Sequence, residues 1–281
     1  MQTLTTIQAL RETLAQQRTA GQRIALVPTM GNLHAGHIHL VEQARHYADA
    51  VVCTIFVNPM QFGPNEDLDA YPRTLELDQE KLRAAQCDFL FLPSVAQMYP
   101  LGLAQHTVVS VPGLSSGYCG ASRPGHFEGV ATVVSKLFNM VQPHSALFGL
   151  KDYQQFKVIQ KMVADLCQPI DVIGVPTQRE PSGLALSSRN GYLSTEQKAK
   201  AVALIQTLQW ASEALLQGAS IDEVEAQAKQ RLVVAEFKPD YFSVCDADSL
   251  EAPSPQTKAL VILAAAWMGK TRLIDNLRFD R

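Results

Sequence analysis

The 281-residue chain lacks the features that mark several broad classes of protein. Its five cysteines are widely spaced and include no CxxC pair, which excludes a disulfide framework and a cysteine-rich structural zinc site. The longest apolar stretch, from Leu260 to Met268, has about half of the length that a membrane span needs. The formal net charge is only −3, and no run of Lys or Arg indicates a nucleic-acid or anionic-membrane partner.

Targeting signals are also missing from the sequence. The start, Met1-Gln2-Thr3-Leu4-Thr5, has neither the basic region nor the apolar core of a signal peptide. Together with the unpaired cysteines, this favours a reducing, cytoplasmic compartment. Cys53 and Cys167 lie in apolar stretches, and we expect both to be small buried hydrophobic residues.

Two common nucleotide-binding fingerprints fail to match. The glycines at 113, 117 and 120 do not have GxGxxG spacing, so the dehydrogenase type of dinucleotide site is absent. Met268-Gly269-Lys270-Thr271 resembles the end of a P-loop, but Ala264 stands where the first glycine belongs. We interpret this segment as a hairpin turn between two strands.

What the chain has is a regular alternation of apolar strands and amphipathic helices, with 47% hydrophobic and 18% charged residues, as in ordinary globular enzymes. The patterns predict helices over 6–18, 35–48, 75–85, 125–141 and 154–167, and strands over 23–27, 50–57, 87–92, 107–111, 145–148 and 171–175. This rhythm predicts an α/β fold with a Rossmann-like parallel sheet, in which ligands bind at the carboxyl ends of strands.

The character of the chain changes near residue 176. A long helix is predicted over 195–217 and a second over 221–236, followed by strands over 240–245, 259–267 and 271–276. We therefore expect two domains, a Rossmann-like domain over 1–176 and a smaller α+β domain over 177–281.

The most informative segment joins a strand to a helix and contains two histidines three residues apart. It reads Pro28-Thr29-Met30-Gly31-Asn32-Leu33-His34-Ala35-Gly36-His37 and follows the apolar run at 24–27. A helix N-terminus offers unpaired N–H groups and a partial positive charge, and both imidazoles share one helix face. This combination indicates a site for a triphosphate.

Two other interpretations of the histidine pair stay open at this stage. One ring could cap the helix while the other packs against the core, with no ligand involved. Alternatively, His39 could join His34 and His37 in a metal site, although no fourth ligand is evident in the sequence.

Four further polar segments also follow predicted strands or precede helices, which is where a parallel sheet binds ligands. Each has an ordinary structural explanation when taken alone, as turn chemistry, a helix cap or a surface ion pair. They are Phe56-Val57-Asn58-Pro59-Met60-Gln61-Phe62, Ser122-Arg123-Pro124-Gly125-His126-Phe127-Glu128, Gly149-Leu150-Lys151-Asp152-Tyr153-Gln154-Gln155 and Leu186-Ser187-Ser188-Arg189-Asn190.

Taken together and in order, these segments resemble the pantoate–β-alanine ligase (pantothenate synthetase) family, over about two-thirds of the chain. The HxGH element alone is shared with class I aminoacyl-tRNA synthetases and other HIGH-motif nucleotidyltransferases. The resemblance implies that pantoate attacks the α-phosphorus of MgATP, giving pantoyl adenylate and pyrophosphate, and that β-alanine then displaces AMP. It implies a homodimer, small-molecule substrates, and a C-terminal domain that acts as a lid.

The resemblance also implies roles for individual residues. Catalytic roles fall to His37, as the proton donor, and to His34, Lys151 and Arg189. Gln61 and Gln155, with Asn58, would bind pantoate, and Gln61 would also lie near β-alanine. Asp152 would be a ligand of Mg²⁺, which the ATP phosphates mainly hold. The implied ATP-binding residues are Met30, Gly31, Asn32, Leu33, His34, Ala35, Gly36, His37, Gly149, Leu150, Lys151, Asp152, Gln178 (through its backbone), Leu186, Ser187, Ser188 and Arg189.

Three rival functions can be separated from this one. A simple nucleotidyltransferase, such as a phosphopantetheine adenylyltransferase, is usually shorter and does not need the amide pair of Asn58 and Gln61. An RNA-binding fragment of a synthetase would carry a basic stripe, which is missing. A metal hydrolase built on His34, His37 and His39 would depend on a bound metal ion. Metal analysis after chelation would distinguish it from the ligase.

Overall fold

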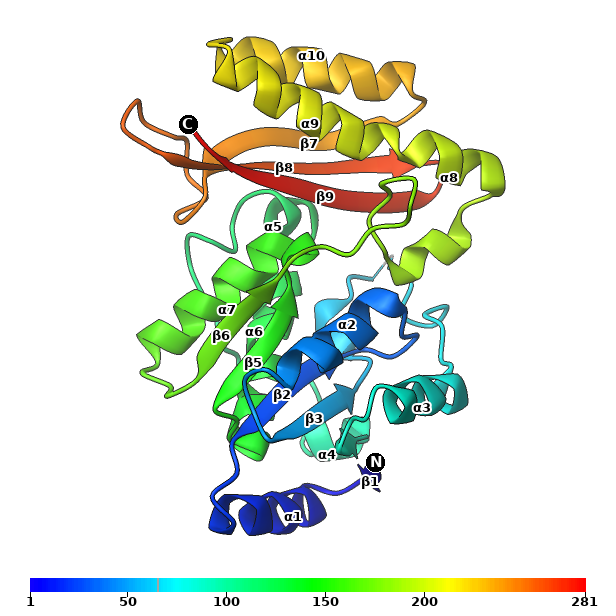
Figure 1. The fold of residues 1–281 in the computed structure, drawn as a ribbon, viewed down its shortest axis with the longest axis vertical. Helices are drawn as coiled ribbons and strands as arrows, with labels where there is room; N and C mark the ends of the chain where they lie inside the picture. The colour runs from blue at the N-terminus through cyan, green and yellow to red at the C-terminus, as the bar shows by residue number, and fades with distance from the viewer. Residues whose placement is uncertain (65) are drawn as a thin grey trace. The chain divides into compact units, whose positions relative to one another are not determined.

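The structure is a computed structural model that describes residues 1–64 and 66–281, and it divides into two compact units (Figure 1). The first unit comprises 1–116, 123–150 and 155–176, and the second comprises 117–122, 151–154 and 177–281. Short segments from the middle of the chain thus belong to the second unit. The predicted lid role of the C-terminal domain stays a prediction.

The first unit contains a six-stranded sheet in which every pair of neighbouring strands is parallel, in the order β1-β4-β3-β2-β5-β6. Residues 24–27 and 50–53 are fully or almost fully buried, because helices cover both faces of the central strands. This explains their continuous apolar sequence. The strands are β1 (Gln2–Leu4), β2 (Ile24–Thr29), β3 (Ala50–Ile55), β4 (Phe89–Phe91), β5 (Ser145–Gly149) and β6 (Asp171–Val175).

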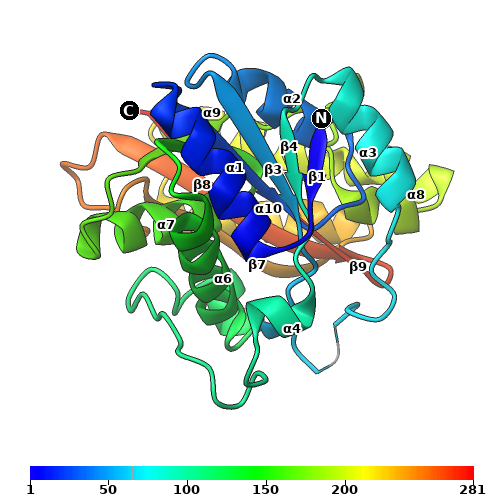
Figure 2. The same ribbon diagram turned by 90° about the horizontal axis from the view of Figure 1, so that it is seen from below.

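Helices α2 (Ala35–Ala44) and α3 (Leu75–Ala84) contact each other on one face of this sheet. Helices α1 (Ile7–Thr19) and α6 (His126–Val141) contact each other on the opposite face, which α7 (Tyr153–Asp165) also covers (Figure 2). This arrangement follows from right-handed crossovers that run in opposite directions from β2. The 3₁₀ turn η1 (Pro59–Gln61) and α4 (Val95–Met98) complete the unit, and the turn η2 (Leu150–Asp152) lies where the chain passes from the first unit to the second.

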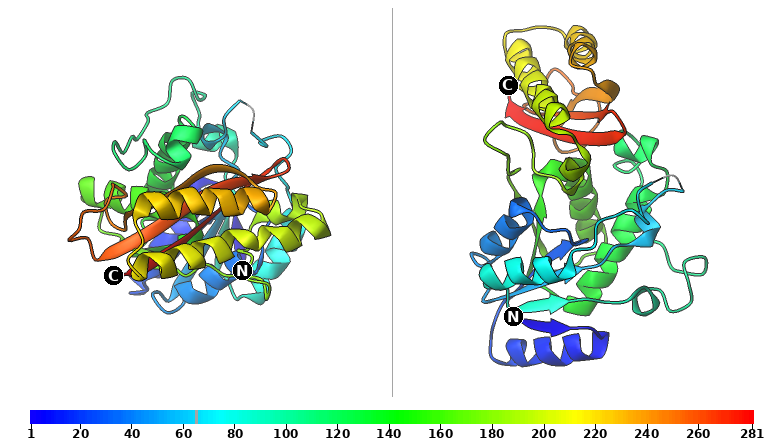
Figure 3. Two further views of the ribbon diagram at one scale, coloured as in Figure 1. Left: turned by 90° about the horizontal axis from the view of Figure 1, so that it is seen from above. Right: turned by 90° about the vertical axis from the view of Figure 1, so that its right-hand side faces the viewer.

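The second unit is built on an antiparallel sheet of β7 (Lys238–Asp246), β8 (Ala259–Met268) and β9 (Thr271–Asp280). Helices α9 (Ala203–Leu216) and α10 (Ile221–Val234) lie side by side over one face of it (Figure 3). The other face contacts α5 (Cys119–Ser122) and its neighbours, since Tyr118 and Cys119 bond to side chains of β7. Helix α8 (Thr195–Ala201) and the turn η3 (Ser188–Tyr192) precede α9.

These elements confirm the predicted α/β class, with a parallel sheet and a smaller α+β part, and they match the predicted elements closely. The hairpin is also confirmed: Met268 pairs with Thr271 across a two-residue turn in which Gly269 has φ of 60°. The strand predicted to break at Pro28 instead continues to Thr29. By that point β2 pairs with β3 alone, so the missing N–H of proline costs little.

Three other predictions are wrong. Residues 107–111 form no strand; the N–H of Val109 donates to the Thr132 hydroxyl (2.9 Å) instead of to a neighbouring strand. The helix predicted over 195–217 is two helices that meet at Val202, where no Gly or Pro signals the break. Cys167 is exposed, because it follows the end of α7 in a left-handed turn with φ of 51°.

Cys53, in contrast, is fully buried as predicted, and burial raises the pKa of its thiol well above the usual value. Across residues 1–64 and 66–281, the helices are too short or too polar to cross a membrane.

Candidate functional site

The histidine pair begins α2, directly after the end of β2. Gly31 and Asn32 form the connecting turn with positive φ angles of 80° and 49°. His34 is the N-cap of α2, and its Nδ1 accepts a hydrogen bond from the Gly36 N–H (3.2 Å). The N–H of His34 donates to Nδ1 of His37 (3.3 Å), and the two ring centroids are 4.0 Å apart.

This capping geometry determines which ring nitrogen carries the proton. Each Nδ1 faces a backbone N–H and therefore acts as an acceptor, so each neutral ring carries its hydrogen on Nε2. The sequence suggested that one ring could cap the helix while the other packs, but in the structure both rings accept backbone N–H groups at the start of α2. This capping does not compete with the ligand interpretation, because it makes both imidazoles hydrogen-bond donors at Nε2.

Helix α3 holds the turn before α2 through two side chains on one face. The carboxylate of Asp78, which is 1% exposed, accepts the backbone N–H groups of Asn32 and Leu33 at 2.8 Å each. Lys81 donates to the Leu33 carbonyl (2.6 Å). A Cβ at Gly31 would lie 3.2 Å from Oδ2 of Asp78, so the turn is tightly seated.

Gln61 and Asn58 lie in and beside η1, after the end of β3, and both are buried. Nδ2 of Asn58 donates to Oε1 of Gln61 (3.2 Å), and Nε2 of Gln61 donates to Sδ of Met30 (2.9 Å). The contact with Met30 brings the predicted pantoate residues to the predicted ATP-binding turn within the first unit. A side chain at Gly129 of α6 would collide with the backbone of η1, 2.7 Å from the Gln61 nitrogen.

Arg123 and His126, from the polar segment at the start of α6, bind protein groups beside Gln61. Arg123 pairs with Glu66 (2.6 Å) and donates to Nε2 of His126 (2.9 Å), whose Nδ1 donates to the Gln61 carbonyl (2.8 Å). Burial raises the pKa of Glu66, but hydrogen bonding and the charge of Arg123 outweigh it, so the net pKa lies below its usual value.

The Gly149–Asp152 segment follows β5, as predicted. Gly149 and Leu150 belong to the first unit, while Lys151 and Asp152 belong to the second. The carbonyl of Lys151 accepts a hydrogen bond from Nδ2 of Asn276 on β9 (2.8 Å). The side chain of Asp152 is exposed, so its carboxylate is accessible to a hydrated cation. Gln155, partly buried, lies in the first turn of α7.

The Ser-Ser-Arg segment lies in the second unit and follows a loop braced against β9. Arg179 forms a two-bond ion pair with Asp275 (2.6 and 2.9 Å), and Asp275 is 5% exposed. The Gln178 carbonyl accepts the N–H of Leu186 (2.9 Å). The hydroxyl of Ser187 then caps η3 by accepting the N–H of Arg189 (3.2 Å), which leaves Ser188 and Arg189 in its first turn.

The geometry gives no support to the three-histidine metal centre. Nδ1 of His39 lies 3.6 Å from Oε2 of Glu42 on its own helix, and so pairs with a carboxylate there. Among the residues that the structure describes, no three His, Cys, Asp or Glu side chains gather in a way that could hold a metal ion.

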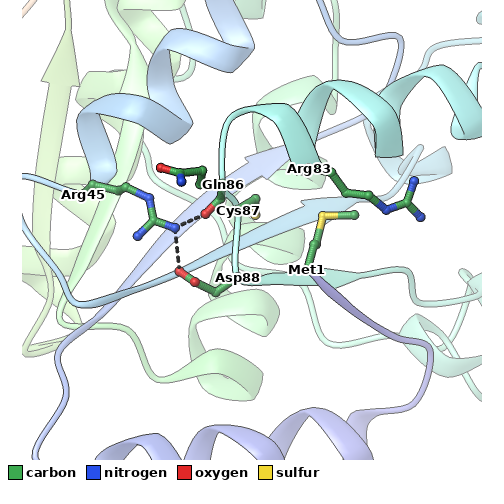
Figure 4. A pocket seen from close by; sticks show the side chains of 6 residues that line it. All are labelled: Met1, Arg45, Arg83, Gln86, Cys87 and Asp88. Atoms are coloured by element: carbon green, nitrogen blue, oxygen red, sulfur yellow. Dashed lines mark hydrogen bonds and ion pairs between the residues drawn. The ribbon is translucent and has the colours of Figure 1, made fainter.

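A separate hollow lies at the amino ends of the strands in the first unit, near the start of β1 and β4 (Figure 4). There Arg45 bonds to the Gln86 carbonyl and to Asp88 (3.2 Å). It contains no predicted site residue, which agrees with ligand binding at the carboxyl ends of parallel strands. The lining residues are Met1, Arg45, Arg83, Gln86, Cys87 and Asp88.

Sequence reasoning missed several residues that support the predicted ones. Asp78 had a visible signal, since it lies four residues before Leu82 on the buried face of α3. A carboxylate is rarely buried unless other groups bond to it. Tyr99, whose hydroxyl donates to Oδ1 of Asn58 (2.6 Å), carried no such signal, and neither did Asp275 and Asn276, because their partners are distant in the sequence.

Comparison with known proteins places the whole chain in one family. The family described as Pantoate-beta-alanine ligase matches residues 2–278. A pantothenate synthetase of Pseudomonas savastanoi pv. phaseolicola is 58% identical over 282 residues, covering 100% of both chains. A pantothenate synthetase of Shewanella baltica (strain OS223) is 59% identical over 275 residues, covering 98% of each.

Solved structures agree with this assignment. The crystal structure of pantothenate synthetase from Thermus thermophilus has a TM-score of 0.92 at 46% identity and 99% coverage of both chains. The pantoate-beta-alanine ligase of Francisella tularensis, solved in complex with "Beta-gamma ATP" and β-alanine, has a TM-score of 0.78 at 34% identity, with 99% of this chain and 97% of that chain covered. This chain therefore belongs to the pantoate-beta-alanine ligase family.

Proposed function

We propose that the chain catalyses the ATP-dependent condensation of pantoate with β-alanine, through a pantoyl adenylate, and that the predicted site residues divide this work as set out below. Membership of the family supports the reaction. The observation that carries the assignment of roles is the histidine pair at the start of α2, in which both Nδ1 atoms accept backbone N–H groups and both Nε2 atoms are therefore donors.

The first step joins two anions. A carboxylate oxygen of pantoate forms a bond to the α-phosphorus of ATP, and the bond from that phosphorus to pyrophosphate breaks. In the second step, the amine of β-alanine attacks the acyl carbon, AMP leaves with its electron pair, and the amine loses a proton. The protein must therefore offset negative charge and hold the reactants in line, without any covalent nucleophile.

The ATP-binding turn, Met30 to His37, provides the hydrogen-bond donors for the phosphates. His34 and His37 donate hydrogen bonds from Nε2, and the bond from His37 stabilises the negative charge on pyrophosphate as it leaves. Asp78 and Lys81 keep this turn in place from α3. The N-terminus of α2 adds its partial positive charge to the same end of the helix.

The remaining nucleotide contacts come from two other segments. Gly149, Leu150, Lys151 and Asp152 continue the nucleotide site, with the Lys151 ammonium directed to the α-phosphate. Gln178 contributes its backbone, and Leu186, Ser187, Ser188 and Arg189 bind phosphate oxygens through hydroxyl, N–H and guanidinium donors.

The amide side chains bind the uncharged parts of pantoate and its carboxylate. Gln61 and Gln155 hold pantoate, and Gln61 also contacts β-alanine. Asn58 supports them through its hydrogen bond to Gln61 (3.2 Å). A carboxamide offers both donors and acceptors without adding charge, so it suits a hydroxy acid whose carboxylate must stay nucleophilic.

Magnesium fits this site as a partner of the ATP phosphates. One exposed carboxylate, Asp152, beside substrate phosphates is the kind of environment in which proteins bind this ion. When bound, Mg²⁺ would supply charge neutralisation at the phosphates. The family resemblance further implies a homodimer, which light scattering after size exclusion would test. The free thiols fit a reducing, cytoplasmic compartment.

A product assay tests the function. With ATP, pantoate, β-alanine and Mg²⁺ present, we expect AMP and pantothenate in equal amounts, and no AMP release when pantoate is omitted. Exchange of labelled pyrophosphate into ATP should require pantoate but not β-alanine. Exchange without pantoate, or AMP release without pantothenate, would refute the adenylate route.

A further inference from the structure

The side chain of Asn58 forms hydrogen bonds with four partners in the first unit. It is 1% exposed and lies directly before η1. Its Oδ1 accepts the N–H of Met60 (3.3 Å) and the hydroxyl of Tyr99 (2.6 Å). Its Nδ2 donates to the Gly129 carbonyl (3.0 Å) and to Oε1 of Gln61 (3.2 Å).

Two of these partners fix the orientation of the Asn58 amide. A backbone N–H can only donate and a carbonyl can only accept, so Met60 requires the oxygen on its side and Gly129 requires the nitrogen on the other. It follows that Tyr99 donates its proton to Oδ1. These four bonds use both donor hydrogens and both acceptor positions of the amide, so Asn58 has no capacity left for a substrate.

The orientation of Asn58 in turn fixes the orientation of Gln61. Because Nδ2 of Asn58 donates, the group of Gln61 that faces it must be the oxygen. The NH₂ group of Gln61 therefore points the other way, towards the sulfur of Met30 (2.9 Å). A thioether is a weak acceptor, so an oxygen of a bound substrate would be a better partner for these hydrogens.

We propose that Tyr99 and Asn58 are positioning residues that lock the Gln61 amide with its NH₂ group outward, so that Gln61 meets the acid substrate as a hydrogen-bond donor. The oxygens that this arrangement selects are acceptors, namely those of a carboxylate or of a hydroxyl group. This inference rests on the proposed function and adds that Asn58 acts through Gln61 instead of touching pantoate.

The surroundings of Tyr99 suit a residue that must stay protonated and in place. Burial raises the pKa of its hydroxyl to about 12, so it remains a donor at neutral pH. The His106 ring meets the Tyr99 ring edge-on, with centroids 4.8 Å apart, and the Lys136 ammonium lies 5.4 Å from the Tyr99 centroid. Phenylalanine would keep this packing and remove only the donor.

A double-mutant cycle tests whether Tyr99 acts through Gln61. We would measure the KM for pantoate and kcat in pantoate-dependent pyrophosphate exchange for Tyr99→Phe, Gln61→Ala and the double variant. Tyr99→Phe should raise the KM about 3- to 10-fold with a smaller change in kcat, as expected for one lost hydrogen bond. In the Gln61→Ala background, Tyr99→Phe should change the KM for pantoate by less than about 2-fold. Equal effects in both backgrounds would overturn the proposal.

A spectroscopic measurement keeps the proposal testable without any substrate. The side-chain NH₂ resonances of Gln61 in ¹⁵N-labelled protein, assigned with Gln61→Glu, should shift in Tyr99→Phe and in Asn58→Ala. They should not shift in Tyr47→Phe, a matched control whose ring is exposed. Unshifted resonances in both test variants would overturn the proposal. If the unmodified protein showed no pantoate-dependent exchange, that result would count against the proposed function. The resonance measurement would still show whether Tyr99 and Asn58 orient the Gln61 amide.

Discussion

The carboxylate of Asp78 is the side chain whose replacement should most clearly separate support of the ATP-binding turn from direct contact with ATP. It is buried, and it accepts two backbone N–H groups at 2.8 Å and the hydroxyl of Thr74 at 3.2 Å. Asp78→Asn keeps the shape of the side chain but turns one acceptor oxygen into an NH₂ group. That group must then face a backbone N–H, from either Asn32 or Leu33.

The expected cost can be worked from these bonds. Losing one hydrogen bond to a charged acceptor costs about 1.5–3 kcal/mol, and leaving a buried N–H unpaired costs about 1–3 kcal/mol. Because the two figures partly describe the same loss, we expect about 3 kcal/mol in the free energy of unfolding. For a unit of this size, that corresponds to a Tm lower by roughly 6–12 °C.

Urea and thermal unfolding, followed by circular dichroism, would measure the loss of stability in Asp78→Asn. The matched control is Glu80→Gln, which makes the same change of charge on α3 outside the contacts with the turn. The KM for ATP should rise in the Asp78 variant and not in the control. A free energy of unfolding within about 0.5 kcal/mol of the control, the range of ordinary surface substitutions, would refute the reasoning.

Three other positions in the first unit give predictions of their own. His37→Ala should slow adenylate formation about 100-fold or more in single-turnover measurements, as for the loss of one hydrogen-bond donor to developing charge. An unchanged first step would exclude this role for His37, and His39→Ala is the control. Gly129→Ala should force η1 to move, costing about 1–3 kcal/mol and raising the KM for pantoate, whereas Gly117→Ala, with open space around it, should do neither. The pKa of Glu66 is depressed, so its ion pair with Arg123 stabilises the fold above about pH 4.5 and weakens as the pH falls below that value. Glu66→Gln should therefore lose roughly 0.5–1 kcal/mol at pH 7 but little at pH 3, measured by urea unfolding, and an equal loss at both pH values would contradict this.

The sequence predicted the parallel sheet well because its central strands are buried on both faces and read as continuous apolar runs. It predicted the turn between β2 and α2 for a different reason, namely that proline and glycine mark the end of one element before the helical pattern begins. Both signals are local in the sequence, within a single strand, turn or helix.

What the sequence could not predict depends on contacts between distant residues. The bonds from Tyr99 to Asn58 and from Asp275 to Arg179 join segments 41 and 96 residues apart, so no spacing or periodicity reveals them. Residues 107–111 alternate like a strand, yet they have no neighbouring strand and bond to a helix side chain. Periodicity reports which faces are covered, but it does not report which segment covers them.

The burial of β8, the central strand of the antiparallel sheet, limits where the chain can be truncated for expression. Residues 260–266 of β8 are all buried, and helices α9 and α10 can account for only one of its two faces. Tyr118 and Tyr153, which bond to Cys245 and to the Ala247 carbonyl, belong to the same unit but precede Thr177 in the chain. A fragment expressed from Thr177 onwards would leave a row of Val261, Leu263 and Ala265 open to water, and such a product should self-associate instead of behaving as an autonomous module.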